Sequence, residues 1–106
     1  MKITIERANR QTIEQFAEQH GLEMNVVERD SGFHGTNGQF YAHFKHAETK
    51  DGCILCGEHG NGITPEKAIR DYGKKISEKT LVIDSMGKNR RTIHVPIIVS
   101  KSEDDE

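Results

Sequence analysis

Short stretches in which apolar and polar residues alternate are the dominant pattern of this sequence, and glycine-rich turns separate them. The stretch from Lys2 to Arg7 places Ile3 and Ile5 on one side of an extended chain, which is typical of a half-buried strand. Similar patterns predict five more strands, over residues 22–29, 39–48, 53–58, 80–84 and 92–95.

The predicted strand over residues 39–48 has two unlike sides. The sequence Asp51-Gly52 after it is typical of the tight turn that closes a hairpin. We therefore expect it to pair with the strand over residues 53–58. Its apolar side is formed by Phe40, Ala42 and Phe44, and its polar side by Tyr41, His43 and Lys45.

Two helices are predicted from their ends. Thr12 followed by Gln15 has the form of a capping box, and Gly21 is suited to end that helix in the left-handed conformation. The second helix begins at Thr64, whose hydroxyl can accept a hydrogen bond from a first-turn amide, with Pro65 at the first helical position. It extends to about Ser77, with an apolar face formed by Ala68, Ile69, Tyr72 and Ile76.

These elements, in the order β-α-β-β-β-α-β-β, predict an α+β fold. We expect one six-stranded antiparallel sheet with both helices packed on it. No linker divides the chain, so residues 1–99 should form a single domain and residues 100–106 an acidic, disordered tail. Six short strands leave edges and apolar surface that a homo-oligomer would cover.

Composition and charge limit the partners of the chain. At 33% hydrophobic and 30% charged residues it is a polar protein with a modest core. Its formal net charge of −2 would be +2 without the four acidic residues at 103–106, so the strongly basic footprint of a DNA-binding protein is absent. No apolar run is long enough to span a membrane, and the charged N-terminus is unlike a signal peptide. The chain has only two cysteines and no export signal, which favours a reducing compartment. That compartment is a cytoplasm, either the protein's own or that of a host cell.

The stretch from Gly60 to Glu66 is the first candidate site. Gly60, Asn61 and Gly62 precede a helix start, and glycines before a helix N-terminus offer free amides and the positive end of a dipole, which favour anions. The simpler interpretation is a strand-to-helix turn without a ligand. No third glycine follows at the spacing of a dinucleotide fingerprint.

Cys53 and Cys56 have the Cys-x-x-Cys spacing of zinc and redox sites. Residues three apart on a regular strand point to opposite faces, and a second cysteine pair is missing. We therefore predict two small buried residues and no metal site.

Arginines near turns are the second candidate site. Asn89, Arg90 and Arg91 lie in the predicted turn before the last strand, and Arg7 and Arg29 end two earlier strands. Arginine forks bind phosphate bidentately and stack on adenine, so these residues suit a small diphosphate or a cyclic nucleotide. The alternative is a set of solvated charges without a function.

Two apolar side chains near these turns extend the candidate site. Phe33 is alone in the glycine-rich loop over residues 30–38, where it either covers part of the core or stacks on a ligand. Met86 precedes Asn89 and is a candidate contact for a base. The six histidines and the serines form no nucleophile–base set, metalloprotease motif or P-loop. We therefore expect no enzymatic activity and no cofactor.

At the second helix and the last strands the sequence resembles the first-described family of phage Thoeris anti-defence sponges. The resemblance covers residues 2 to about 97. The motifs that carry it are Gly60-Asn61-Gly62-x-Thr64-Pro65-Glu66-x-Ala68-Ile69-x-Asp71-Tyr72, Ile76-Ser77, Leu81-Val82 and Asn89-Arg90-Arg91-x-Ile93-x-Val95-Pro96.

This resemblance implies a six-stranded antiparallel sheet with two helices, assembled into dimers that can form hexamers. It implies that the protein sequesters the cyclic ADP-ribose isomer made by bacterial Toll/interleukin-receptor domain enzymes, without cleaving it. Some family members also hold cyclic oligonucleotides of the CBASS system at separate sites. The ligand-binding residues that we carry over are Gly60, Asn61, Gly62, Asn89, Arg90 and Arg91, with Arg7 and Arg29 as weaker candidates.

A second resemblance is to HicB-type antitoxins, which carry a Thr-Pro-Glu-x-Ala helix on a partly buried sheet. The residues concerned are Tyr41-Ala42-x-Phe44, Asp51-Gly52-Cys53 and Thr64-Pro65-Glu66-x-Ala68. Nothing after Pro96 matches the DNA-binding domain that HicB proteins usually append. The sequence therefore favours a sponge for cyclic nucleotide signals in the cytoplasm of a host bacterium, with a protein-binding inhibitor as the alternative.

Overall fold

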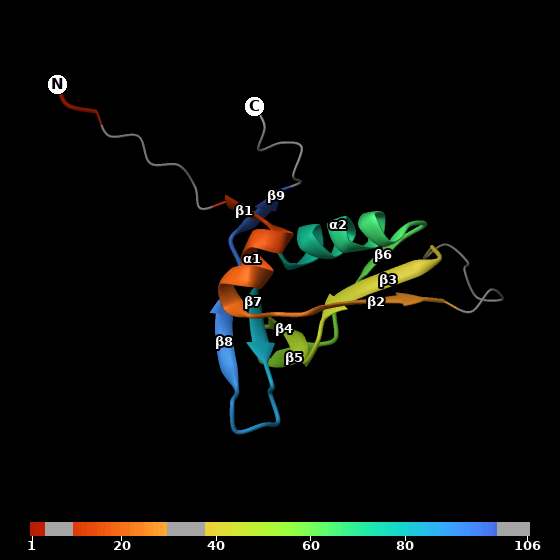
Figure 1. Cartoon of the computed structure of the whole chain (residues 1–106). Coiled ribbons are helices and arrows are strands. Elements are labelled where there is room, and N and C mark those ends of the chain that lie inside the picture. The colour runs from red at the N-terminus through yellow and green to blue at the C-terminus, as the bar shows by residue number, and fades with distance from the viewer. Residues whose placement is uncertain (4–9, 30–37, 100–106) are drawn as a thin grey trace.

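A computed structural model of the chain describes residues 1–3, 10–29 and 38–99. The fold is α+β, as expected, and the described residues form two helices, α1 (Ile13–His20) and α2 (Pro65–Ile76) (Figure 1). The described strands are β1 (Arg10–Thr12), β2 (Met24–Glu28), β3 (Phe40–Phe44), β4 (Ala47–Asp51), β5 (Ile54–Cys56), β6 (Gly60–Gly62), β7 (Thr80–Ile83), β8 (Arg91–His94) and β9 (Ile97–Val99).

The expected single six-stranded sheet is wrong, because the described strands form three separate sheets. One has three antiparallel strands in the order β2-β3-β6, one has four in the order β5-β4-β7-β8, and β1 pairs with β9 in parallel. The separation arises within the predicted strand over residues 39–48. At His46 the backbone is left-handed, with φ of 63°, so the chain turns and its two halves, β3 and β4, join different sheets.

The predicted N-terminal strand from Lys2 to Arg7 falls largely outside the described residues. Met1, Lys2 and Ile3 are described, and they form no strand. The first strand of the structure, β1, instead lies immediately before α1, where no strand was predicted, and it pairs with Ile97–Val99. The predicted tail over residues 100–106 also lies outside the described residues.

Both helix starts are as predicted from the sequence. In α1 the Thr12 hydroxyl accepts from the Gln15 amide at 3.2 Å, and the Gln15 side chain accepts from the Thr12 amide at 2.9 Å. Gly21 follows in the left-handed conformation, with φ of 64°. In α2 the Thr64 hydroxyl accepts from the Lys67 amide at 3.2 Å. These contacts satisfy first-turn amides that the helices leave without a partner.

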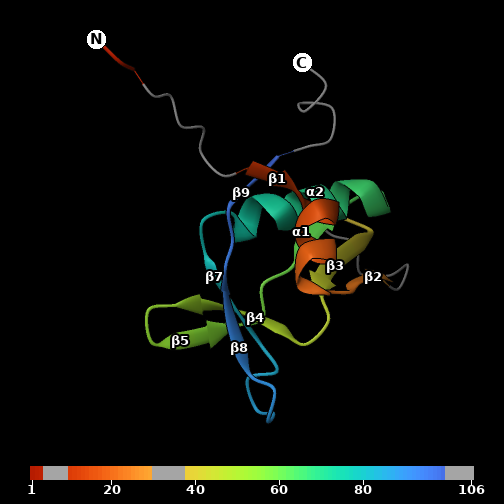
Figure 2. The ribbon, with the colours of Figure 1, turned by 60° about the vertical axis from the view of Figure 1, so that its left-hand side comes forward.

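The core lies between the helices and the two larger sheets. In Figures 1 and 2 the four-stranded sheet lies below α1 and α2, while α2 runs beside the three-stranded sheet. The predicted apolar face of α2 is buried at Ala68, Tyr72 and Ile76. The other buried hydrophobic side chains of the core are Ile13, Phe16, Ala42, Phe44, Leu81, Val82, Ile83, Ile93 and Val95.

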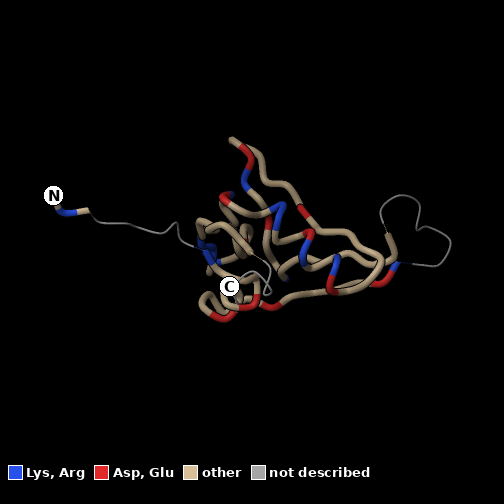
Figure 3. Tube along the Cα trace, turned by 90° about the horizontal axis from the view of Figure 1, so that it is seen from above, with Lys and Arg blue, Asp and Glu red and all other residues tan. Residues whose placement is uncertain are grey.

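Lys and Arg residues are interspersed with Asp and Glu along the described chain, rather than gathered on one element (Figure 3). Neither α1 nor α2, the helices of the described residues, is both long and apolar enough to cross a membrane.

Candidate functional site

The glycine stretch before α2 is a strand rather than the predicted turn. Gly60, Asn61 and Gly62 form β6, which pairs antiparallel with β3 and places Asn61 opposite Tyr41. Helix α2 packs closely on the same strand. A Cβ on Gly60 would lie only 2.1 Å from the Tyr72 amide nitrogen. A Cβ on Gly62 would lie 2.5 Å from the Ala68 amide nitrogen. Both glycines therefore permit close packing of strand and helix.

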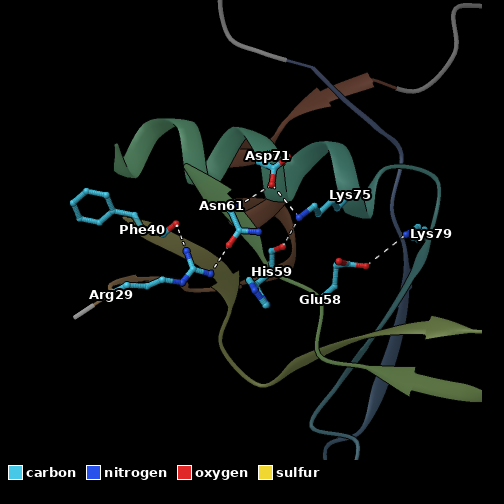
Figure 4. Close-up of polar contacts among 8 residues, drawn as sticks. All are labelled: Arg29, Phe40, Glu58, His59, Asn61, Asp71, Lys75 and Lys79. Carbon is cyan, nitrogen blue, oxygen red and sulfur yellow. Dashed lines mark hydrogen bonds and ion pairs between the residues drawn. The ribbon is translucent and has the colours of Figure 1, made fainter. Parts of the chain in front are cut away.

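The amide of Asn61 is occupied within the chain. It donates to the Asp71 carboxylate on α2 at 2.8 Å, and Lys75 forms an ion pair with the same carboxylate at 3.1 Å (Figure 4). Partial burial tends to raise the pKa of Asp71, but the Asn61 amide, Lys75 and the charge of Lys74 together hold that pKa below its ordinary value of 3.8. An anion at this amide would compete with a charged carboxylate.

Asn61 and Arg29, two of the residues predicted as ligand contacts, are brought together by the fold. A guanidinium nitrogen of Arg29 donates to the side-chain oxygen of Asn61, although the residues are 32 positions apart. The other terminal nitrogen donates to the carbonyls of Gly38 at 3.0 Å and Phe40 at 3.3 Å. The guanidinium therefore joins the end of β2 to β3 and β6 (Figure 4).

The Arg29 guanidinium also lies over the ring of Tyr41, 4.9 Å from its centroid. The His43 ring is nearly parallel to Tyr41, at 14° and 6.2 Å between centroids, and His59 meets Tyr41 edge-on at 5.4 Å. We call Arg29, Tyr41, His43, His59 and Asn61 the aromatic cluster. All five residues are partly exposed, so the cluster forms a surface of flat rings and polar groups.

The aromatic cluster lies on the face of the three-stranded sheet opposite Ala42 and Phe44, which are fully buried. Side chains alternate between faces along a strand, so Tyr41 and His43 emerge on the other side of β3. Tyr41, His43 and His59 were not among the predicted site residues. The sequence signal was the spacing of two ring-bearing residues, at positions 41 and 43, on the polar side of a strand.

A surface hollow of about 310 Å³ begins where the aromatic cluster ends, and His43 belongs to both. Met86, a predicted base contact, lines this hollow and is almost fully exposed. Ser85 donates a hydrogen bond from its hydroxyl to the Glu48 carboxylate at 2.5 Å. The lining residues are His43, His46, Ala47, Glu48, Asp84, Ser85, Met86 and Gly87.

The predicted Asn89-Arg90-Arg91 group lies beside this hollow and does not reach the glycine strand within the chain. Arg90 donates to the Ser85 carbonyl at 3.4 Å, and Arg91 donates to the His20 carbonyl at the end of α1 at 2.6 Å. Figure 1 shows the connection between β7 and β8 at the lower end of the fold, away from β6. Arg7 and Phe33 lie outside the described residues.

The prediction that Cys53 and Cys56 are buried is wrong, because both thiols are exposed. They lie on the hairpin of β4 and β5, where β5 is the outer strand of its sheet. Within residues 1–3, 10–29 and 38–99, no group of three or more His, Cys, Asp or Glu side chains is placed to hold a metal ion.

The chain matches no protein-family model, no curated protein and no solved structure. What the site can bind therefore follows from its own side chains. The aromatic cluster offers stacking surfaces and a cation, which suit a flat aromatic ring. The hollow beside the cluster offers polar groups, which suit the part of a ligand that is attached to its aromatic ring.

Proposed function

We propose that this protein is a phage anti-defence sponge that binds cyclic nucleotide immune signals without cleaving them. Its ligands would be cyclic ADP-ribose isomers, and the effect would be inhibition of Thoeris immunity. The observation that carries the proposal is the position of Arg29 over Tyr41, with His43 stacked beside the Tyr41 ring and Asn61 accepting a hydrogen bond from Arg29. The sequence resemblance to the Thoeris sponges supports the same ligand class.

Stacking would supply the affinity for the base. Aromatic side chains hold nucleobases by π-stacking worth about 1–3 kcal/mol per base. The three rings of the aromatic cluster are partly exposed, so they retain surface for a ligand. Arg29 uses its terminal nitrogens for Asn61, Gly38 and Phe40, so its role is to orient the cluster rather than to bind a phosphate as a fork. Arg90 and Arg91 remain the candidates for the phosphates.

Enclosure would require a second copy of the chain. Pockets that hold small ligands bury most of the ligand surface, whereas the aromatic cluster and the hollow are open on the outside of one chain. A dimer or a hexamer would close this surface, and would also bring Arg90 and Arg91 of one copy to the cluster of another. We propose that this assembly acts in the cytoplasm of the host bacterium.

The test is to incubate the purified protein with the product of an activated Toll/interleukin-receptor enzyme, remove the protein by filtration, and then boil and filter it. If the protein is a sponge, the signal is missing from the first filtrate and is recovered intact in the filtrate obtained after boiling. Signal that stays free throughout overturns the proposal and favours a protein-binding inhibitor. Signal that returns cleaved identifies an enzyme instead.

Variants connect this activity to the site. Tyr41→Ala should weaken uptake strongly while Tyr41→Phe, which keeps the ring, should retain it. The double variant Arg90→Ala with Arg91→Ala should also weaken uptake without unfolding the protein. Unchanged uptake in the double variant would show that this loop is not part of the ligand site. Unchanged uptake in Tyr41→Ala would show the same for the aromatic cluster.

A further inference from the structure

The hollow next to the aromatic cluster has a chemical character of its own. Two carboxylates and a hydroxyl, from Glu48, Asp84 and Ser85, line it together with two imidazoles, and none of its lining residues is Lys or Arg. Carboxylates repel phosphate and accept hydrogen bonds from hydroxyl groups. The hollow is therefore suited to the uncharged, hydroxyl-bearing part of a ligand.

Asp84 is held so that its carboxylate remains available. Its backbone is left-handed, with φ of 52°, a conformation that Asp and Asn tolerate better than most residues. The amide of Asp84 donates to the His46 carbonyl at 3.0 Å, and its carbonyl accepts from the Gly87 amide at 2.9 Å. Within the described part of the chain, no hydrogen bond or ion pair uses its carboxylate, whereas Glu48 already accepts from Ser85.

The size of the hollow indicates that it takes one part of a larger ligand. Its volume of about 310 Å³ is at the lower end of pockets for complete small molecules, roughly 300–1,000 Å³. His43 lines the hollow and also stacks beside Tyr41. In a nucleoside the sugar is bonded directly to the base, so a base on the aromatic cluster would place its sugar in the adjoining hollow.

We propose that this hollow is a ribose subsite in which the Asp84 carboxylate accepts hydrogen bonds from the vicinal 2′- and 3′-hydroxyls. This inference rests on the proposed nucleotide-binding function and extends it to the sugar. A carboxylate with two acceptor oxygens matches two adjacent hydroxyl donors. Asp84 thus makes the protein selective for ribonucleotides over deoxyribonucleotides.

The experiment measures binding of adenosine 5′-monophosphate, its 2′-deoxy form and its 3′-deoxy form to the full chain by calorimetry. We expect the ribonucleotide to bind about tenfold more tightly than either deoxy form, the size expected for one hydrogen bond to a charged group. Asp84→Asn keeps the size and the tolerance of the left-handed backbone, and should remove most of this preference. Asp51→Asn, an exposed Asp at the end of β4, is the matched control and should retain it.

Three results would overturn the ribose subsite: equal binding of the three nucleotides, no binding of the ribonucleotide, or an unchanged preference in Asp84→Asn. If Asp84→Asn does not fold, Asp84→Gly removes the carboxylate and accepts the same φ. The filtration experiment fails separately. Signal uptake without a ribose preference supports the sponge function and rejects the ribose subsite. A ribose preference that depends on Asp84, without signal uptake, supports the ribose subsite and rejects the sponge function.

Discussion

Gly60 lies against the backbone of Tyr72 so closely that a Cβ at residue 60 would be 2.1 Å from the Tyr72 amide nitrogen and 2.2 Å from the Ala68 carbonyl oxygen. Both of these atoms belong to the backbone of α2, so they cannot rotate away as the end of a flexible side chain can. The glycine before the helix is therefore required for packing, whatever ligand the protein binds. This separates the structural role of Gly60 from the ligand role proposed for its neighbour Asn61.

Gly60→Ala should destabilise the protein by about 3 kcal/mol, because an inserted methyl group would force strand and helix apart. The measurement is the free energy of unfolding from urea denaturation. Gly57→Ala is the control, since a Cβ there meets nothing within 4 Å, and it should leave the unfolding midpoint nearly unchanged. Equal midpoints for the two variants would show that β6 and α2 are not packed as described.

Arg29→Lys should lower stability by about 2 kcal/mol although the positive charge is kept. Lysine cannot hold the geometry of a fork that donates to Gly38, Phe40 and Asn61, and hydrogen bonds from charged groups contribute about 1.5–3 kcal/mol. Arg70→Lys on the exposed surface of α2 is the matched control. Identical urea midpoints for both substitutions would contradict a clamping role for Arg29.

Tyr72 should make the protein less stable at alkaline pH. Burial raises the pKa of Tyr72 to about 12. The hydrogen bond with the Phe44 backbone acts in the opposite direction, and the negative charge of Glu58 adds to the rise. In the unfolded chain the phenol ionises at its ordinary value of 10.0, so the unfolded state loses this proton first. Stability is therefore fully present below about pH 10 and falls between about pH 10 and 12.

The measurement for Tyr72 is the urea midpoint as a function of pH. Tyr72→Phe should flatten the alkaline decline, whereas Tyr41→Phe, at the partly exposed tyrosine, should leave it in place. A decline that persists unchanged in Tyr72→Phe would assign it to other groups.

The helices and their ends could be predicted from the sequence because their determinants are local. The Thr12 capping box, the left-handed Gly21 and the Thr64 cap involve residues within a few positions of each other. The buried face of α2 follows from helical spacing alone. The same holds for Ala42 and Phe44 on the apolar side of β3, because alternation along a strand is also local.

The arrangement of the sheets was decided by contacts that no local pattern contains. Alternation continues through residues 39–48, but the left-handed backbone at His46 ends one strand and directs the next into another sheet. Gly60-Asn61-Gly62 has the composition of a turn, yet pairing with β3 and packing against α2 extend it as a strand. Exposure of Cys53 and Cys56 likewise depends on β5 being an outer strand.

The candidate site divides in the same way. Arg29, Asn61 and Met86 could be selected from residue type and position near turns, since their chemistry is evident in the sequence. Only the tertiary structure placed Arg29 against Asn61 and over Tyr41, and made His43 common to the aromatic cluster and the hollow. The physical reason is that residue type determines which interactions a side chain can make, whereas long-range strand pairing and helix packing determine which partners it meets.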